Sequence, residues 1–234
     1  MKTLYLIPAP LSDVNLHHVF PDYNMQIISE LDIFVVENIR TARRFIKRAA
    51  HDVEIDKLQF FELNKHTKIT ELQEITQIFN DGKDIGFMSE AGCPAIADPG
   101  AELVCLAQKF DYKIIPLVGA SSILLALMAS GFNGQNFAFI GYLPVKEQDR
   151  VRTIKKLENR VFAENQTQIF IETPYRNSKI ISDLLKNLNP HARLCIAADL
   201  TAQTQFISTK KICEWKKSSI PDLNKRPAIF LIYK

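Results

Sequence analysis

The chain lacks the short glycine motifs that mark several common enzyme classes. It contains no G-x-G-x-x-G fingerprint of dinucleotide-binding sites and no G-x-x-x-x-G-K-[ST] phosphate loop. It also has no G-x-S-x-G nucleophile elbow and no readable Ser/His/Asp pattern. The sequence therefore gives no support to a nicotinamide-dependent enzyme, a P-loop nucleotide hydrolase or a serine hydrolase.

Cysteine is scarce in this chain. Only four cysteines occur among the 234 residues: Cys93, Cys105, Cys195 and Cys213. None forms a C-x-x-C pair, and no histidine lies at metal-ligand spacing from them, so we expect no metal site. We interpret the cysteines as reduced thiols, which predicts a cytoplasmic protein.

Long apolar runs are absent as well. No stretch approaches the ~20 apolar residues that are needed to span a bilayer. The apolar run at residues 4–7 ends at Pro8 and is too short for a signal peptide. We therefore expect no membrane partner.

The chain does have the length and apolar content for two domains. Its 234 residues suit two domains of about 115 residues each. Hydrophobic residues make up 47% of the sequence, so each half can bury a core. The net charge of +3 is too small to indicate nucleic-acid binding unless the cations are clustered.

Short apolar runs alternate with helical patterns along the whole chain. The runs in the first half are apolar throughout, which is typical of strands that are covered on both faces. Such alternation indicates a parallel sheet with helices on its faces. We expect strands at residues 3–7, 33–36, 85–88, 113–117, 138–141, 168–172, 193–198 and 228–233. We expect helices at residues 41–50, 67–80, 101–109, 147–160 and 177–188.

The pattern breaks near Val118-Gly119-Ala120, where a predicted strand ends and a new helix begins. The sequence therefore predicts an α/β protein made of two α/β domains. Residues 1–118 form the first domain, with a mostly parallel sheet, and residues 119–234 form the second.

Two loops at predicted strand ends are rich in small residues and proline: residues 88–100 and residues 116–122. In α/β sheets, ligands bind outside the carboxyl ends of the strands, and small residues let the backbone approach them closely. Each loop has a plainer interpretation. The first could be a simple crossover, and the second could only cap the helix that follows it.

Basic residues gather in two segments. Residues 40–48 contain five cations, and four of them, Arg40, Arg43, Arg44 and Lys47, share one face of the predicted helix. Residues 146–156 contain five more, in the other half of the chain. Each segment is either a solvated helix face or a surface that contacts RNA phosphates.

Six segments, taken in order along nearly the whole chain, match motifs of one known family. The matches are residues 4–11 to an opening strand with T-P-I-G-N-L, 37–40 to E-D-T-R, 89–100 to S-D-A-G-T-P with S-D-P-G, 116–121 to P-L-P-G-P-S, 139–144 to F-x-G-F-L-P, and 172–176 to E-S-P-H-R. The chain therefore resembles the tetrapyrrole methylase superfamily, and most closely its bacterial 16S rRNA cytidine-2′-O-methyltransferase (small-subunit methyltransferase I) type.

The chain departs from these motifs at several positions. Ser12-Asp13 replace the G-N of the first loop. The aspartate of S-D-A-G is Glu90 here, and the threonine of G-T-P is Cys93. The histidine of E-S-P-H-R is Tyr175.

The resemblance implies a methyl donor, an acceptor and an assembly. The donor is S-adenosylmethionine, held in a cleft between the two domains, and the acceptor is a ribose 2′-hydroxyl of small-subunit ribosomal RNA. The resemblance also implies a homodimer. The donor-binding positions that it implies are Pro8, Glu90, Gly92, Cys93, Ile96, Gly119, Ala120, Ser121, Ile171 and Ala228.

A ribose hydroxyl is a poor nucleophile and needs its proton removed during attack. Glu37, Glu172 and Glu90 are the candidate bases. Arg40 and Arg176 are placed by their motifs to hold phosphate, because guanidinium binds it in a bidentate manner. Glu37 and Arg40 could instead form a structural ion pair.

Two other functions stay open at this point. The same fold could methylate a tetrapyrrole or another small molecule. The chain could also be a non-catalytic RNA-binding relative that has lost the donor site.

Overall fold

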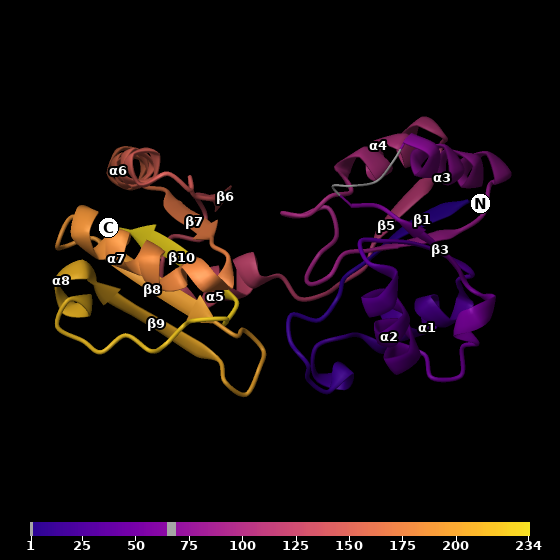
Figure 1. Ribbon diagram of the computed structural model, residues 1–234, viewed down its shortest axis with the longest axis horizontal. Coiled ribbons are helices and arrows are strands. Elements are labelled where there is room, and N and C mark those ends of the chain that lie inside the picture. The colour runs from indigo at the N-terminus through magenta and orange to yellow at the C-terminus, as the bar shows by residue number, and fades with distance from the viewer. Residues whose placement is uncertain (1, 65–68) are drawn as a thin grey trace. The chain divides into compact units, whose positions relative to one another are not determined.

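The computed structural model describes residues 2–64 and 69–234, and its chain divides into two compact units, Met1–Ser121 and Ser122–Lys234 (Figure 1). Each unit contains its own five-stranded sheet with helices packed against it. The predicted α/β class is confirmed. Within the described residues, no helix is long and apolar enough to cross a membrane.

The sheet of the first unit is entirely parallel. Its strands are β1 (Thr3–Ile7), β2 (Ile33–Val36), β3 (Gln59–Glu62), β4 (Ile85–Met88) and β5 (Lys113–Pro116). They lie in the order β3-β2-β4-β1-β5. Because all the strands run the same way, the loops that follow them meet at a single edge of the sheet.

Helices cover both faces of this sheet. They are α1 (Asp22–Glu30), α2 (Ile39–Ala49), α3 (Ile69–Asp81) and α4 (Ala101–Lys109), with short 3₁₀ turns at Leu16–His18 and Ile55–Lys57. Figure 1 shows α1 and α2 on one face and α3 and α4 on the other. Phe34 and Val36 of β2 belong to the core beneath α1 and α2, whereas Ile33 and Val35 belong to the opposite core. This two-sided burial explains why the strands read as continuous apolar runs.

The sheet of the second unit is mixed. Its strands are β6 (Phe137–Tyr142), β7 (Thr167–Ile171), β8 (Arg193–Ala198), β9 (Phe206–Lys211) and β10 (Ala228–Tyr233). They lie in the order β6-β7-β10-β8-β9, and only the β6–β7 pair is parallel. Its helices are α5 (Ser122–Ser130), α6 (Glu147–Glu164), α7 (Asn177–Asn187) and α8 (Ile212–Trp215), with a 3₁₀ turn at Pro174–Arg176. Helices α6, α7 and α8 share one apolar core with the sheet, and α5 packs against β9 and β10.

Four elements besides the 3₁₀ turns were not predicted from the sequence: α1, β3, β9 and the one-turn helix α8. Strands β3 and β9 are edge strands whose residues are at most half-buried, so their sequences carry polar residues that weaken an apolar pattern. Helix α1 buries only Asn24, Ile27 and Ile28. The helix expected at residues 67–80 is observed from Ile69, and residues 67 and 68 lie outside the described residues.

Candidate functional site

Three loops converge at the carboxyl edge of the first sheet, after the adjacent strands β4, β1 and β5. The loops after β1 and β4 are joined by a two-way backbone bridge, in which Ala9 N–H donates to Gly92 O at 2.8 Å and Gly92 N–H donates to Ala9 O at 2.9 Å. The loop after β5 is held from α1, because the buried Asn24 side chain donates to Val118 O at 2.8 Å. We call these three segments the loop platform.

Glycine is required at two positions of the loop platform, for different reasons. A Cβ atom on Gly119 would lie 2.2 Å from Pro8 Cγ. The loops after β1 and β5 can therefore lie this close together only because residue 119 has no side chain. Gly92 has a φ of +76°, which L-residues rarely adopt. Its Cβ position would be only in ordinary contact, 3.4 Å from Leu11 Cδ2. Gly119 therefore provides space and Gly92 provides conformational freedom.

Cys93 connects two loops of the platform. Its thiol donates to Ala120 O, with 3.6 Å between sulfur and oxygen. Burial raises the pKa of the Cys93 thiol, which keeps it protonated and able to donate. The thiol thus makes a bond that a threonine hydroxyl could make in the related G-T-P motif.

The loop after β4 has strained backbone on both sides of an exposed apolar residue. Ala95 and Ala97 both have a left-handed backbone, with φ values of 64° and 66°. Between them, Ile96 is 52% exposed although it is a large apolar residue. Strain of this kind costs about 1–3 kcal/mol per residue and tends to collect at ligand-binding sites. The structure therefore singles out the same loop as the sequence motif.

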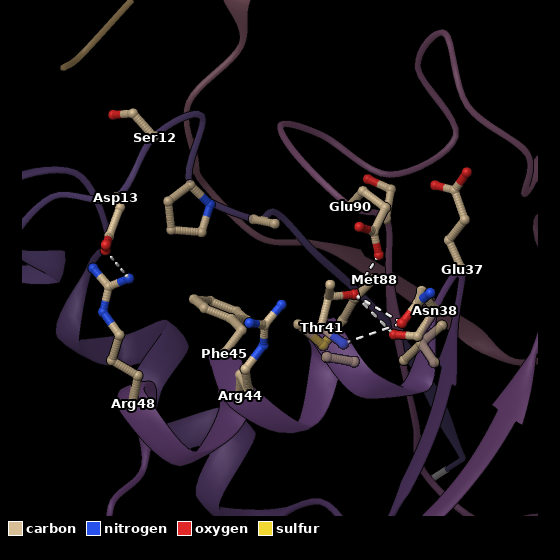
Figure 2. Close-up of a pocket in the computed structure, with 15 residues that line it drawn as sticks. Ser12, Asp13, Glu37, Asn38, Thr41, Arg44, Phe45, Arg48, Met88 and Glu90 are labelled. Atoms are coloured by element: carbon tan, nitrogen blue, oxygen red, sulfur yellow. Dashed lines mark hydrogen bonds and ion pairs between the residues drawn. The ribbon is translucent and has the colours of Figure 1, made fainter.

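A pocket of about 440 Å³ lies beside the loop platform, at the ends of β1, β2 and β4 and against α2 (Figure 2). Two of the predicted site residues, Glu37 and Glu90, line it. Its other lining residues are Ala9, Pro10, Ser12, Asp13, Val36, Asn38, Thr41, Ala42, Arg44, Phe45, Arg48, Met88 and Ser89.

Thr41 ties the pocket wall on α2 to the loop after β4. Its hydroxyl contacts Glu90 Oε1 across 49 residues of sequence, as drawn in Figure 2. Asn38 caps α2, because its side chain accepts from Thr41 N–H at 3.2 Å. Glu90 is one methylene longer than the aspartate of the related motif, and in this chain that longer carboxylate meets Thr41. No motif letter marks Thr41, so the sequence did not predict it as a site residue.

The four cations of the basic face predicted on α2 have different surroundings in the structure. Arg43 pairs with Asp56 and lies over the Phe60 ring, 5.7 Å from its centroid. Lys47 donates to His51 O at 2.6 Å, beyond the end of the helix. Arg44 lines the pocket, and Arg40 is exposed. The four cations therefore do not form one common binding surface.

Three cations of the second basic segment, at residues 146–156, also lie close to carboxylates of the protein. Arg150 is buried, and its side chain lies 2.6 Å from Asp183 Oδ2, so it is not available to a polyanion. Lys155 pairs with Glu158 at 3.1 Å, and Arg152 lies 3.7 Å from Asp149. Of the five cations, Arg150 is therefore removed from any exposed basic face, and the other four remain at the surface.

The predicted site residues of the second unit gather at one end of its sheet. Ile171 ends β7 and pairs with Ile229, next to Ala228 at the start of the antiparallel strand β10. The Glu172 side chain is 1% exposed and forms an ion pair with Arg176 at 2.7 Å. Its carboxylate also accepts from Thr173 N–H at 2.7 Å. Of the three candidate bases, Glu37 and Glu90 line the pocket of the first unit, and Glu172 does not.

Comparisons with known proteins identify the family of the chain. A family model described as Tetrapyrrole (Corrin/Porphyrin) Methylases matches residues 24–214. A protein named ribosomal RNA small subunit methyltransferase I from Buchnera aphidicola subsp. Acyrthosiphon pisum is 29% identical over 222 residues, which cover 92% of this chain and 73% of that protein. The protein of the same name from Halalkalibacterium halodurans is 32% identical over 197 residues, which cover 82% of this chain and 63% of that protein.

Solved structures show the same fold at low sequence identity. The methyltransferase CobJ matches with a TM-score of 0.64 and 14% identity, over 100% of this chain and 95% of that one. Uroporphyrin-III C-methyl transferase from Thermus thermophilus, complexed with S-adenyl homocysteine, matches with a TM-score of 0.55 and 13% identity, over 100% of this chain and 98% of that one. At these identities the likeness establishes the fold.

Proposed function

The chain belongs to the tetrapyrrole (corrin/porphyrin) methylase family, and on that premise we propose that it transfers a methyl group from S-adenosylmethionine to a ribose 2′-hydroxyl of small-subunit ribosomal RNA. The names of its relatives support an RNA acceptor. The observation that carries the proposal is the position of the pocket, which Glu37, Glu90 and Arg44 help to line, directly beside the loop platform. Because the acceptor is ribosomal RNA, we also propose that the protein acts in the cytoplasm.

The loop platform suits a donor that is held largely by backbone groups. Because Gly92 and Gly119 have no side chains, the three loops can lie close together. Ile96 stands exposed on the strained loop and offers an apolar contact. The contributions of Ile171 and Ala228, from the second unit, stay predictions from the family resemblance. S-adenosylmethionine supplies a methyl group already activated on a sulfonium, so the protein's task is to align it with the acceptor.

The pocket suits the acceptor. Glu37 or Glu90 would accept the proton of the attacking hydroxyl, since both line the pocket. The contact from Thr41 orients Glu90, which fixes the direction of its carboxylate. A tetrapyrrole substrate that carries many carboxylates would meet Glu37 and Glu90 as like charges, which disfavours it here.

A methyl-transfer assay tests the acceptor. The protein is expected to move the labelled methyl group of S-adenosylmethionine to unmethylated 30S subunits and not to uroporphyrinogen. Label on the tetrapyrrole alone would reassign the acceptor. Absence of transfer to either, together with no heat of donor binding in calorimetry, would favour a non-catalytic RNA-binding protein.

Gly92→Val tests the donor position. This variant is expected to lose donor affinity in calorimetry while it stays folded. A β-branched residue at a φ of +76° costs roughly 1–2 kcal/mol. Its methyl groups would also press on Leu11, which is already 3.4 Å from the Cβ position, and on Ala120 O at 3.7 Å.

Gly131→Val is the matched control for this variant. Gly131 has a φ of +70°, and nothing lies within 4 Å of its Cβ position. Both variants should lose similar thermal stability, and only Gly92→Val should lose the donor. Unchanged donor affinity in a folded Gly92→Val protein would remove this loop from the site.

We further propose a homodimer, from the family resemblance. Leu124 and Met128 of α5 are large apolar side chains that are 51% and 79% exposed, which is consistent with a surface that a second copy covers. A monomeric molar mass in light scattering would contradict it.

A further inference from the structure

Most of the cations on helix α2 are already engaged. Arg43 pairs with Asp56, Lys47 donates to His51 O, and Arg48 pairs with Asp13 at 2.7 Å. In the part of the chain that the structure describes, Arg40 and Arg44 have no ion-pair partner. Their hydrogen-bond donors are therefore available to an external anion.

Arg40 and Arg44 lie one helical turn apart on the exposed side of α2. Side chains four residues apart on a helix are neighbours, roughly 5–6 Å apart at Cβ. Figure 2 shows Arg44 rising from α2 into the pocket, with the Arg48–Asp13 pair on one side of it and Glu37 and Glu90 on the other. The two arginines thus form a short cationic track with one end in the pocket.

The pocket presents opposite charges at two positions. Arg44 provides a guanidinium on the helix side, and Glu37 and Glu90 provide carboxylates at the ends of β2 and β4. A ligand that fits must carry an anion toward α2 and hydrogen-bond donors toward the carboxylates. A nucleotide within a strand has this polarity, because its phosphate is anionic and its ribose hydroxyls donate.

We propose that Arg40 and Arg44 bind successive backbone phosphates of the RNA strand and seat the intervening ribose in the pocket, with its 2′-hydroxyl toward Glu37 and Glu90. This inference rests on the proposed function and specifies how the acceptor is bound. Arg43 and Lys47, although they lie on the same helix, take no part.

The test measures RNA binding of the full-length protein as a function of salt. The probe is a short single-stranded RNA oligonucleotide, and the variants are Arg44→Gln, Arg40→Gln and their combination. Each lost phosphate contact is expected to weaken binding roughly tenfold at low salt. Each should also reduce the slope of log K against log salt by about 0.7. The double variant should lose about twice as much slope as either single variant.

Arg43→Gln is the matched control, since it removes the same charge from the same helix. Its salt slope should equal that of the unmodified protein, and donor affinity should be unchanged in all four variants. An oligonucleotide of DNA with the same sequence should show the same slope and weaker binding, because it lacks the 2′-hydroxyl.

The outcomes separate this inference from the function on which it rests. An unmodified protein that methylates 30S subunits and binds the RNA, while Arg44→Gln binds it equally well, overturns the inference and leaves the function intact. A larger loss from Arg43→Gln than from Arg44→Gln overturns it as well. An unmodified protein that neither methylates 30S subunits nor binds the RNA overturns both.

Discussion

Gly119→Ala is expected to lower kcat/KM for methyl transfer on the order of 100-fold, because it forces the loop after β5 away from the loop after β1. The added Cβ would lie 2.2 Å from Pro8 Cγ and 2.4 Å from Pro8 Cβ, distances that real Cβ atoms do not show. A proline ring has no flexible end that can move aside, so the loops themselves must separate. A displacement of about 1 Å at a reacting site can cost this much in rate.

Two measurements on the same variant show whether the effect is on the donor site or on overall stability: the affinity for S-adenosylmethionine by calorimetry, and the free energy of unfolding in urea. Overpacking of this kind typically costs about 1–3 kcal/mol of stability, so the protein should remain folded. Gly134→Ala is the matched control, because nothing lies within 4 Å of the Cβ position at Gly134. A Gly119→Ala protein with the donor affinity and rate of the control would show that the contact between these loops does not shape the donor site.

Arg150→Met is expected to cost about 3–5 kcal/mol of unfolding free energy, the largest stability loss that we predict. Both Arg150 and Asp183 have side chains that are only 3% exposed, and they meet at 2.6 Å. The same guanidinium donates to Val145 O at 2.5 Å and to Pro144 O at 3.1 Å. The substitution would therefore leave a buried carboxylate and two carbonyl groups without this donor.

Two controls accompany this measurement by urea unfolding. Arg152 lies on the same helix, and its side chain is 75% exposed. Arg152→Met should therefore cost no more than about 1 kcal/mol of unfolding free energy. Arg150→Met combined with Asp183→Leu should recover part of the loss, since no unpaired charge is then buried. Equal losses for Arg150→Met and Arg152→Met would contradict a structural role for the buried pair.

Two departures from the family motifs have local structural counterparts. Cys93 takes the place of a threonine, and its thiol still donates to Ala120 O. Glu90 takes the place of an aspartate, and its longer side chain is met by Thr41 from α2. These contacts keep the loop after β4 connected to its neighbours, so the substitutions are compatible with an intact loop platform. Tyr175 is 75% exposed, and nothing in the structure explains why it replaces histidine.

The sequence by itself determined the α/β class, the family and the loops at which ligands are expected to bind. Strands buried on both faces must be apolar throughout, and this left visible runs at β1, β2 and β4. The edge strand β5 is only partly buried, and its apolar Ile114-Ile115 made it visible as well. Loops at strand ends that approach a ligand need small residues and prolines, so they also stood out. The edge strands β3 and β9 contain polar residues that interrupt an apolar run, and for that reason their sequences did not reveal them.

Only the tertiary structure decided which charged side chains are available for chemistry. Helical periodicity placed four cations on one face of α2, but it did not show which cations of the chain are paired. Arg48 meets Asp13 across 35 residues, and Arg150 meets Asp183 across 33. Such pairs form when strand order and helix packing bring distant segments together, which no local pattern encodes. Among the described residues, Arg44 has no ion-pair partner and lines the pocket together with Glu37 and Glu90, so the pocket identifies it and the motif does not.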